Sequence, residues 1–597
     1  MIRVNFAGAS LVDPGSYTDV QIAQSGAAAP ALGIVALIGE SEEGPAFVNE
    51  SGLSAVSYGP DEFHAMVEKY GSGELVDAAK LAISPSNDPQ IRGGAQEIVL
   101  LKTNNSTVAQ LVIPQGASPF GTLSAKRAGV PGNSVAYQCS IVGGQAIITL
   151  SRLDTGVKEV SSPLGGAAVL TLQCTDATAT TATVVIAASQ LTTSVAGATA
   201  AQSLVLDLKR FPTVRQLVDF LNSQPGYAAS TPTAALGARP TSELDNTPSH
   251  DIKVAYTIKK DFAEVAAFFS KSALVNFAPA AGASGLPSTK AKTYLTGGTK
   301  GSTSAAAVQT CIDALLKRRV NFIVPLFSRD AASDIADGLT DSSSTYSIAA
   351  IHQGVAAHCN QAATIKGRKE RQGFVGFKDT FLNSVEASAQ LSAARVQCQI
   401  QDVDVLSAST GLIALKQPHM AAVISASMKA SAPVGLPNTF KQPLIDGFSH
   451  ADFDPETMSE KAIEANLSFI ENAPKGGFRF KIDNSTYSLI DGTEWANNRP
   501  SVLYAADTAA YSIRLSTERF VGQRNSDISE ETVKNQMVTI MDSLKTAGII
   551  VASSANPKGY KDLTVKINGS IVNIGVTLIL VEGIEFVLSS IKVQRAG

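Results

Sequence analysis

Short apolar runs alternate with amphipathic stretches along much of the chain. Two runs, IVALIG (Ile34–Gly39) and EIVLLK (Glu97–Lys102), are apolar at nearly every position, as strands buried on both faces are. Two predicted helices, Asp61–Tyr70 and Glu74–Ile83, lie between them. After residue 293 the alternation continues with the segments Ala305–Arg318, Asn321–Phe327, Ala349–Ala362, Gly373–Phe377, Ser384–Ala394 and Asp402–Ser407. This order predicts an α/β layer with a largely parallel sheet, which the two early strands join.

Between these stretches the pattern changes to short strands rich in Thr, Ala, Ser and Val. One helix is predicted there, in TVRQLVDFLNSQPGY, with an apolar face of Val214, Leu217, Val218 and Leu221. Beyond Asp446 the pattern becomes α+β. Its clearest helix starts at Ser529, carries the apolar stripe Val533, Met537, Ile540, Met541 and Leu544, and stops at Gly548. Nearly everything after that helix is predicted to be strand.

These changes of pattern divide the chain into five predicted parts. They are an N-terminal arm (1–29), a discontinuous central α/β domain (30–125 and 251–445), a β-rich insertion (126–250), a C-terminal α+β domain (446–570) and a C-terminal β-arm (571–597). A chain of 597 residues exceeds what one hydrophobic core normally fills, so several domains are expected.

Composition narrows the functional classes. A net charge of -4 argues against generic nucleic-acid binding, and five cysteines without a CxxC pair indicate reduced, buried thiols made in a cytoplasm. The longest apolar run, Ile571–Val581, is too short to span a membrane, and the first residues lack the basic and apolar regions of a signal peptide. We therefore expect a soluble protein without membrane insertion.

A glycine-rich loop, TGGTKGSTS (Thr296–Ser304), raises the question of phosphate binding. A Walker loop needs GxxxxGK[ST], but Lys300 precedes Gly301 here, and the glycine spacing does not fit GxGxxG either. We interpret the loop as a tight turn, followed by Ser302, Thr303 or Ser304 as the cap of the next helix. An α/β nucleotide-binding or hydrolytic enzyme with its site at residues 296–304 remains the alternative.

Other candidate chemistry is weak. His352, His358 and Cys359 share a predicted helix, but their spacing differs from the i, i+4 pattern of zinc ligands, and ordinary packing is the favoured interpretation. GxSxG and HExxH motifs are absent. The sequence thus predicts no catalytic residue, no cofactor and no metal. Arg514, Arg519 and Arg524 are interpreted as a solvated face or as a surface that docks an acidic partner.

Several short motifs occur in the order found in contractile tail sheath proteins, which form the outer tube of contractile-tailed phages and related injection systems. YLTGGTKGSTS followed by NFIVPLF resembles the family's L-x-GG-x-x-G segment. The other similar segments are PGSY, IVALIGESEEGP, IRGGAQEIVLLKT, AKRAGVPGNSV, SIRLSTERFVGQ, AGIIVASS and GIEFVLSSIKV. Together they cover about residues 1–135 and 290–597, while Pro443–Trp495 shows no clear counterpart.

The resemblance implies a structural protein, not an enzyme, whose central domain is subtilisin-like in fold. It implies stacked hexameric rings that contract around an inner tail tube, with terminal arms exchanged between copies as added strands. Predicted arm contacts are Val4, Phe6, Tyr17, Ile584, Phe586, Leu588 and Ile591, and possible tube-facing residues are Arg514, Arg519, Lys534 and Lys545. The alternative for the terminal strands is a sheet closed within one chain.

The implied partners are other copies of this chain, the inner tail tube protein, and the baseplate and tail terminator proteins, without nucleic acid. The implied location is the virion tail, after synthesis in the bacterial host cytoplasm. A secreted surface-array protein is a further possibility, which the Thr/Ala/Ser-rich part would suit and the absence of a signal peptide would not.

Overall fold

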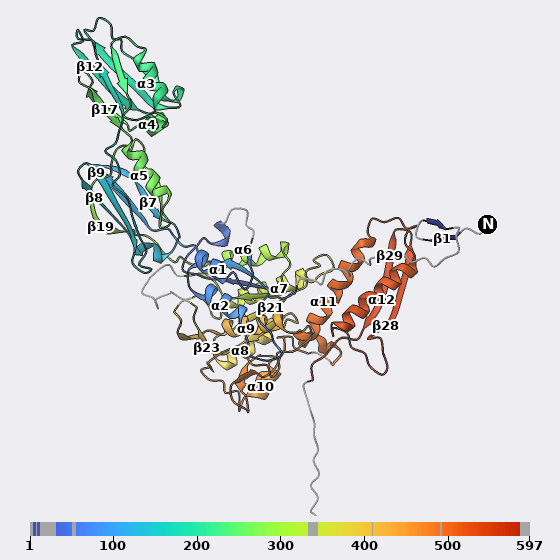
Figure 1. Cartoon of the computed structure of the whole chain (residues 1–597). Coiled ribbons are helices and arrows are strands. Elements are labelled where there is room, and N and C mark those ends of the chain that lie inside the picture. The colour runs from blue at the N-terminus through green and yellow to red at the C-terminus, as the bar shows by residue number, and fades with distance from the viewer. Residues whose placement is uncertain are drawn as a thin grey trace, which may run out of the picture.

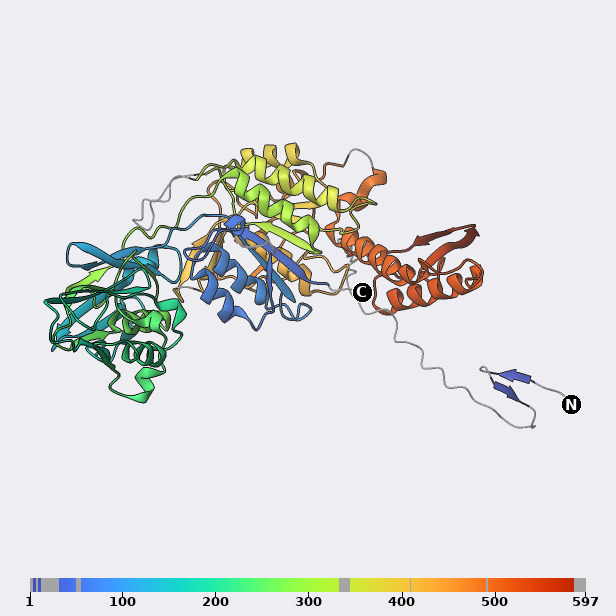
Figure 2. The ribbon, with the colours of Figure 1, turned by 90° about the horizontal axis from the view of Figure 1, so that it is seen from above.

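The computed structural model describes residues 4–6, 9–11, 32–49, 55–331, 344–408, 410–489 and 492–584. Three parts follow one another in space (Figures 1 and 2): a β-rich insertion, a central α/β domain and a C-terminal layer of two helices and a hairpin. The multidomain α/β and α+β fold predicted from the sequence is confirmed.

The central domain is built on a six-stranded sheet of order β22-β21-β20-β3-β5-β4. All neighbours pair in parallel except β4, which is antiparallel to β5. The strands are β3 (Ile34–Gly39), β4 (Val56–Tyr58), β5 (Glu97–Lys102), β20 (Phe322–Pro325), β21 (Gln372–Gly376) and β22 (Val396–Gln399). The largely parallel sheet and its two early strands are as predicted.

Helices cover both faces of this sheet, because its strands are apolar on both sides. Val35 and Leu37 of β3 lie in one core with α1, α2 and α9, while Ile34 and Ala36 lie in another with α6, α7 and α8. The helices are α1 (Phe63–Tyr70), α2 (Glu74–Ile83), α6 (Ala305–Ala314), α7 (Ile348–Ala362), α8 (Phe381–Leu391) and α9 (Pro418–Ser431). Two cores back to back make the central domain a three-layer structure.

One predicted strand of the parallel sheet is corrected by the structure. Residues 402–407 were expected to follow α8 in the sheet, but β22 occupies that place, and β23 (Asp402–Leu406) pairs antiparallel with β24 (Ile413–Lys416) and β25 (Gly447–Ser449). The sequence VQCQ of β22 reads as half polar, yet Gln397 is buried and donates to Asp483 at 3.0 Å. A buried, hydrogen-bonded glutamine is indistinguishable in sequence from an exposed one.

The insertion contains two lobes, each with its own core. The lobe next to the central domain holds β6 (Gln110–Gln115), β7 (Ser118–Ala125), β8 (Val135–Val142), β9 (Gln145–Arg152), β10 (Lys158–Val160), β18 (Val275–Pro279), β19 (Lys290–Tyr294) and α5 (Asp261–Ser270).

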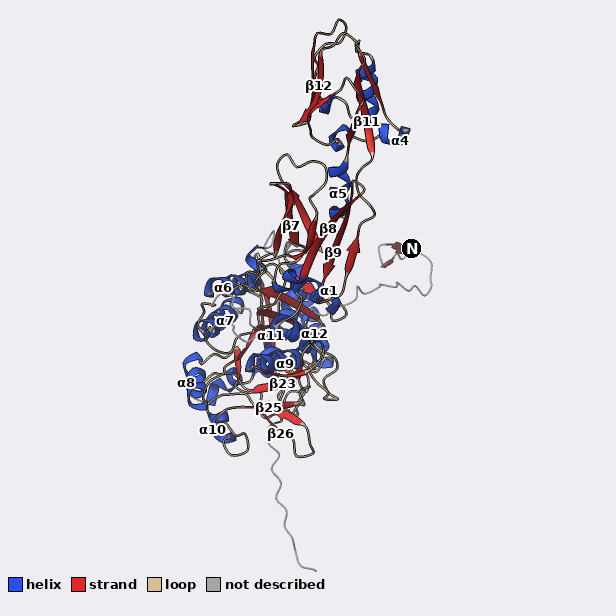
Figure 3. Cartoon of the chain, turned by 90° about the vertical axis from the view of Figure 1, so that its left-hand side faces the viewer, coloured by secondary structure: helices blue, strands red, loops and turns tan. Residues whose placement is uncertain are grey.

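The distal lobe, at the far end in Figures 1 and 3, is a pair of antiparallel sheets with helices. It holds β11 (Ala168–Cys174), β12 (Thr181–Ala187), β13 (Gln190–Ala196), β14 (Val205–Asp207), β15 (Tyr227–Ser230), β16 (Thr247–Asp251), β17 (Tyr256–Lys259), α3 (Val214–Asn222) and α4 (Ala234–Gly237). The predicted face of α3 is buried: Val214, Leu217, Val218 and Leu221.

Strand pairing does not coincide with the expected boundaries of the insertion at 126 and 250. Strand β7 pairs with both β6 and β18, and β8 pairs with β19, so the insertion begins near residue 107 and returns near residue 297. The antiparallel strands that close a lobe come from both ends of the inserted segment. A boundary drawn where the composition changes therefore falls inside the lobe.

The glycine-rich loop lies at the junction between the insertion and the central domain. The carbonyl oxygen of Lys300 accepts hydrogen bonds from Asn104 Nδ2 and Ser106 Oγ, both at 2.8 Å. Ser304 caps α6, since its side chain accepts from the amide of Ala307, which confirms the predicted cap. The two crossings of the chain, 104–110 and 296–301, are bound to each other by bridges such as Thr107 to Thr299.

Residues 446–480 also depart from the predicted C-terminal domain. Phe453, Phe469 and Phe480 lie in the two cores of the central domain, so this stretch belongs to it by packing. The stretch contains α10 (Ser459–Glu464), β26 (Ile470–Asn472) and β27 (Phe478–Phe480). The separate C-terminal layer starts at α11 (Pro500–Thr517) and continues with α12 (Glu530–Thr546), β28 (Tyr560–Asn568) and β29 (Ile571–Leu578).

The junction can be tested with two glycines of the loop. Gly301 has φ +77° and a Cβ there would lie 1.9 Å from the carbonyl oxygen of Asn105, whereas Gly297 has φ +84° and an added Cβ would meet nothing within 4 Å. We expect Gly297→Ala to cost about 1–2 kcal/mol of unfolding free energy from the backbone alone. Gly301→Ala should cost clearly more, measured by denaturant unfolding, and equal losses would contradict this tight packing.

Candidate assembly surface

The C-terminal layer consists of α11, α12 and the hairpin β28–β29. Ser529 accepts a hydrogen bond from the amide of Thr532 and thus caps α12, while Glu530 and Glu531 occupy the positive end of the helix. The predicted stripe of α12 is buried: Val533, Met537, Ile540, Met541 and Leu544. The prediction of this helix, its cap and its buried face is confirmed.

The hairpin alternates apolar and polar side chains. Val565 of β28 is buried, and Ile574 and Val576 of β29 are half-buried against the helices. Exposed side chains on the opposite side include Lys566 and Asn573. One face of the hairpin therefore packs on α11 and α12 and the other faces solvent. The apolar face of β29 is covered only in part.

The edges of this sheet are open. Within the part of the chain that the structure describes, β28 and β29 pair only with each other. The turn Gly569–Ser570 has two residues, so Asn568 and Ile571 form the hydrogen-bonded pair and the backbone of Ile567 faces the outer edge of β28. There the amide of Ile567 donates to Glu530 Oε1 at 2.8 Å. One donor on the β28 edge is thus occupied.

A β-bulge further disturbs β28. The register with β29 shifts between Lys561 and Thr564, and Asp562 between them has φ +56°. Bulges bend a strand and interrupt the regular row of edge groups. The outer edge of β29 has the longer regular row, and it is the better template for another strand.

Helix α11 anchors this layer to the central domain. Arg395 donates to both carboxylate oxygens of Asp507, at 2.6 and 2.8 Å, and both side chains are largely buried. Farther along α11, Arg514 pairs with Glu370, and the guanidinium of Arg319 lies 3.3 Å from the ring centroid of Tyr511. Bidentate and stacked arginine contacts fix geometry as well as charge. The hairpin is therefore held by a rigid base.

The four possible tube-facing residues fall into two groups. Arg514 is paired with Glu370, and Arg519 donates to Gln536 Oε1 at 2.6 Å. Lys534 and Lys545 are exposed on α12, and Lys545 reaches the carbonyl oxygen of Pro557 at 3.0 Å. Because their side chains are exposed, the two lysines of α12 are the preferred candidates for a contact with a tube.

Among the predicted arm residues, Ile584 is the one whose side chain the structure describes. Val4 and Phe6 belong to β1 (Val4–Phe6), whose backbone pairs antiparallel with β2 (Ala9–Leu11) of the same chain. Ile584 is 83% exposed. The other predicted contacts fall outside the described residues: Tyr17, Phe586, Leu588 and Ile591. The expected arm from 571 begins later, because 571–578 form β29 of the hairpin.

The alternative enzyme interpretation gains little from the glycine-rich loop. Lys300 lies between Glu40 and Glu42, 3.6 Å from a carboxylate oxygen of each. An added Cβ at Gly298 would come within 2.5 Å of the carbonyl oxygen of Gly129. The glycines thus allow close packing of two chain segments, and acidic neighbours surround the lysine that would have to meet a phosphate.

The structure also brings together a serine, a histidine and a glutamate that the sequence did not single out. Ser328 Oγ lies 2.9 Å from His419 Nδ1, and His419 Nε2 lies 3.1 Å from Glu74 Oε2. The order of groups resembles a hydrolase triad. However, Ser328 is 1% exposed, its oxygen accepts from the backbone amide of His419, and neither of the two described cavities is lined by these residues. The contacts join α2, the segment after β20 and α9, and are structural.

The other candidate chemistry is also accounted for by packing. Burial lowers the pKa of His352 and of His358 to about 4, and Arg371 adds to the effect at His358. Burial raises the pKa of the Cys359 thiol to about 12. Across the described ranges, no group of three or more His, Cys, Asp or Glu side chains is arranged to hold a metal ion. In the same ranges, no helix is both long and apolar enough to cross a membrane.

The Ser328–His419–Glu74 contacts generate a pH-dependent prediction. Burial raises the pKa of Glu74, but His419 and Lys416 outweigh it and lower the pKa from 4.5 to about 2. Glu74 therefore stabilises the fold above pH 4.5, and this stabilisation is lost as the pH falls from 4.5 toward 2.

Since the Glu74 side chain is 38% exposed, we expect Glu74→Gln to lower the free energy of unfolding by only about 1–2 kcal/mol at pH 7. The loss should shrink below pH 4.5 when followed by denaturant unfolding. Ser328→Ala serves as the control, because it should not show this pH dependence. A loss for Glu74→Gln that is the same at every pH would refute the role of its charge.

Known proteins resemble this chain over nearly its whole length. No family model matches the chain. Over 618 residues it is 25% identical to the tail sheath protein of Bacillus phage SP01, covering 98% of this chain and 96% of that protein. The sheath tail protein from Desulfitobacterium hafniense aligns with a TM-score of 0.50 and 12% identity, over 95% of this chain and 100% of that one. The sheath tail protein from Listeria innocua aligns with a TM-score of 0.49 and 13% identity, over 93% of each chain.

The structural alignment to the Desulfitobacterium protein shows a shared fold, and the sequence alignment to the phage SP01 protein covers 98% of this chain, the insertion included. Over nearly its whole length the chain is therefore similar to the tail sheath protein of Bacillus phage SP01.

Proposed function

We propose that this protein is a structural subunit of a contractile tail sheath. It polymerises as stacked hexameric rings around an inner tail tube, and it contracts to drive that tube through a host envelope. The name of its relative in Bacillus phage SP01 and the fold shared with a sheath tail protein support this role. By the same resemblance, the central domain is proposed to be subtilisin-like in topology, which a strand-by-strand alignment with subtilases would test.

The observation that carries the proposal is the incomplete hairpin sheet. A two-stranded sheet is marginal by itself, and an open edge pairs readily with another chain. Here β28 and β29 pair only with each other within the described residues, and the apolar side chains of β29 are half-buried. An added strand beside β29 would satisfy its backbone groups and cover those side chains.

The terminal segments of neighbouring copies are the proposed source of these strands. The sequence GIEFVLSSIKV (Gly583–Val593) alternates enough apolar and β-branched residues to form a strand. At the other end, β1 and β2 have three residues each, a hairpin short enough to open or to add its edge to another sheet. Val4, Phe6, Tyr17, Ile584, Phe586, Leu588 and Ile591 are the proposed arm contacts.

The strength of such a joint suits a machine that rearranges. Each hydrogen bond contributes about 0.5–1.5 kcal/mol net, so roughly six ladder bonds contribute about 3–9 kcal/mol, and apolar burial adds to this. Such a joint can persist while the domains that it links rotate. Contraction then needs two packings of the same rigid domains, with the extended one metastable. The anchored α11 favours this view, because it makes the hairpin move with the central domain.

The other proposed partners are the inner tail tube, baseplate and tail terminator proteins, in a virion tail assembled in the bacterial host cytoplasm. Lys534 and Lys545 on α12 are the proposed tube-facing residues because their side chains are exposed. The side chains of Arg514 and Arg519 instead bind Glu370 and Gln536 of the same chain.

Deletion of Ile584–Gly597 tests the strand-exchange proposal. We expect a folded monomer that no longer polymerises, because the described cores end before this segment. Circular dichroism would follow the fold, and sedimentation with electron microscopy would follow assembly. Loss of the monomer fold would mean that this strand pairs within its own chain, and tubes of normal length would mean that it is not needed for assembly.

The tube-facing proposal predicts a separable defect. Lys534→Glu with Lys545→Glu should leave the sheath subunit able to polymerise alone, because both side chains are exposed. Binding to purified tail tubes should fall, as measured by co-sedimentation at low and high salt. The matched control is Lys253→Glu, at an exposed residue of the distal lobe. Unchanged tube binding by the double variant would assign the tube contact to another surface.

A further inference from the structure

The sheet β24-β23-β25 exposes large aliphatic side chains on one face. Leu406 lies directly opposite Ile413, and Leu415 lies opposite Asp404. Residues directly opposite each other, and residues two apart on one strand, share a face of the sheet. The exposed aliphatic residues of this face are Leu406 (53%), Ile413 (58%) and Leu415 (57%), and Leu412 (69%) lies in the loop directly before β24; we name these four residues the hairpin patch.

The hairpin patch is not required to complete the core. Val403 and Val405 fill the other face of β23 and are 0% and 1% exposed. β24 is also the outer strand of its sheet, so its far edge is unpaired among the described residues. Contiguous exposed apolar side chains beside an open edge mark an interaction surface.

Acidic groups border this patch. Asp404 lies on the same face as Leu406, and the amide of Asp446 donates to the carbonyl oxygen of Asp404 at 2.8 Å. Asp446 is exposed, and neither carboxylate forms an ion pair within the described ranges. The surface is therefore an apolar patch with a negative border.

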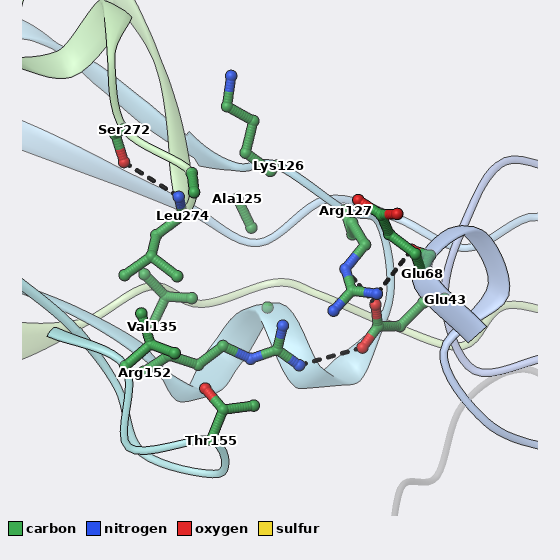
Figure 4. Close-up of a pocket in the computed structure, with 13 residues that line it drawn as sticks. Glu43, Glu68, Ala125, Lys126, Arg127, Val135, Arg152, Thr155, Ser272 and Leu274 are labelled. Carbon is green, nitrogen blue, oxygen red and sulfur yellow. Dashed lines mark hydrogen bonds and ion pairs between the residues drawn. The ribbon is translucent and has the colours of Figure 1, made fainter. Parts of the chain in front are cut away.

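A cavity with the complementary character lies at the base of the insertion (Figure 4). Its volume is about 620 Å³, and its apolar walls include Ala125, Val135, Val157 and Leu274. We name it the basal cavity.

The charged groups of the basal cavity are unequally engaged. Glu43 is held by Arg127 at 2.7 Å and by Arg152 at 3.1 Å, so these charges compensate one another. Lys126 is exposed, and Figure 4 shows its ammonium group extending away from the Glu43 pairs. The described lining thus holds the cations Lys126, Arg127 and Arg152 and the carboxylates Glu43 and Glu68, and Lys126 is its exposed cation outside the Glu43 pairs.

We propose that the hairpin patch of one copy docks in the basal cavity of a second copy. The aliphatic side chains meet apolar walls, and Asp446 meets Lys126. The inference rests on the proposed function, in which copies of this chain polymerise. A second copy is the occupant because each chain carries both an acid-bordered patch and a cavity with an unengaged lysine.

The positions of the two surfaces give the contact a direction. In Figures 1 and 3, β23 lies at the end of the central domain away from the insertion, whereas α1, which lines the basal cavity through Glu68, lies toward it. Contact between two different surfaces is heterologous and repeats from copy to copy. Such a contact closes into a ring or extends a helical polymer, and it does not form a twofold dimer.

Disulfide cross-linking tests this contact directly. The five native cysteines are buried, so a disulfide between copies can be assigned to the introduced surface thiols. We expect Asp446→Cys and Lys126→Cys copies to cross-link when mixed in assembled material, and each alone to cross-link far less. Lys253→Cys on the distal lobe is the control partner for Asp446→Cys. Cross-links of Asp446→Cys with itself alone, or equally with Lys253→Cys, would overturn the proposal.

A second measurement uses the apolar contact. Ile413→Asp with Leu415→Asp should raise the critical concentration for polymerisation by roughly tenfold or more. Val254→Asp, at a residue 73% exposed on the distal lobe, should leave it unchanged. Tubes that form from the mixed Asp446→Cys and Lys126→Cys copies without the cross-link contradict only the docking inference. A mixed cross-link between copies that never form tubes supports docking and contradicts the sheath function.

Discussion

The unpaired backbone at the edges of the β28–β29 sheet is the constraint on which the account depends. Backbone amides and carbonyls need hydrogen-bond partners, and apolar side chains on a narrow sheet need cover. The hairpin is anchored by two helices on one face. Among the described residues no third strand pairs with β28 or β29, and the chain directly after β29 forms one bridge, Ile550 with Leu580. Water can satisfy the edges, but it cannot cover the half-buried face of β29. A strand from a neighbour does both.

The remainder of the molecule holds this hairpin in a fixed place. Arg395 and Asp507 fix α11 to the end of the parallel sheet, and two compact chain crossings fix the insertion at the other side. The buried pair Lys429–Asp483, with side chains 1% and 0% exposed, lies within the central domain. Removing one partner of such a pair is costly, so the geometry is strongly specified. These contacts suit bodies that rotate as units while flexible connections join them.

The sequence predicted elements whose patterns are local. β3, β5 and α2 have the expected bounds, and α12 has its expected cap and buried stripe. Elements that depend on tertiary context were missed. Helix α9 is buried on all sides, so its run of small and apolar residues shows no amphipathic period. Strand β22 was hidden by its two glutamines, of which Gln397 donates to Asp483, far along the chain.

Domain boundaries and contacts across domains were beyond local patterns. β18 pairs with β7 across about 150 residues of chain, and no composition change marks that pairing. Glu74, Ser328 and His419 meet only because three segments converge, so no local pattern connects them. The glycine-rich loop was interpreted correctly as a turn and cap because the spacing rules for phosphate loops are strict. Strand exchange at the termini stays a prediction.

A density map of the assembled polymer by electron cryo-microscopy tests the central claim most directly. The account predicts that the β28–β29 sheet gains at least one strand in the polymer, and that tracing this strand leads to the terminal segment of a different copy. A map in which the hairpin keeps two strands, or in which the added strand traces back to its own subunit, would contradict the account.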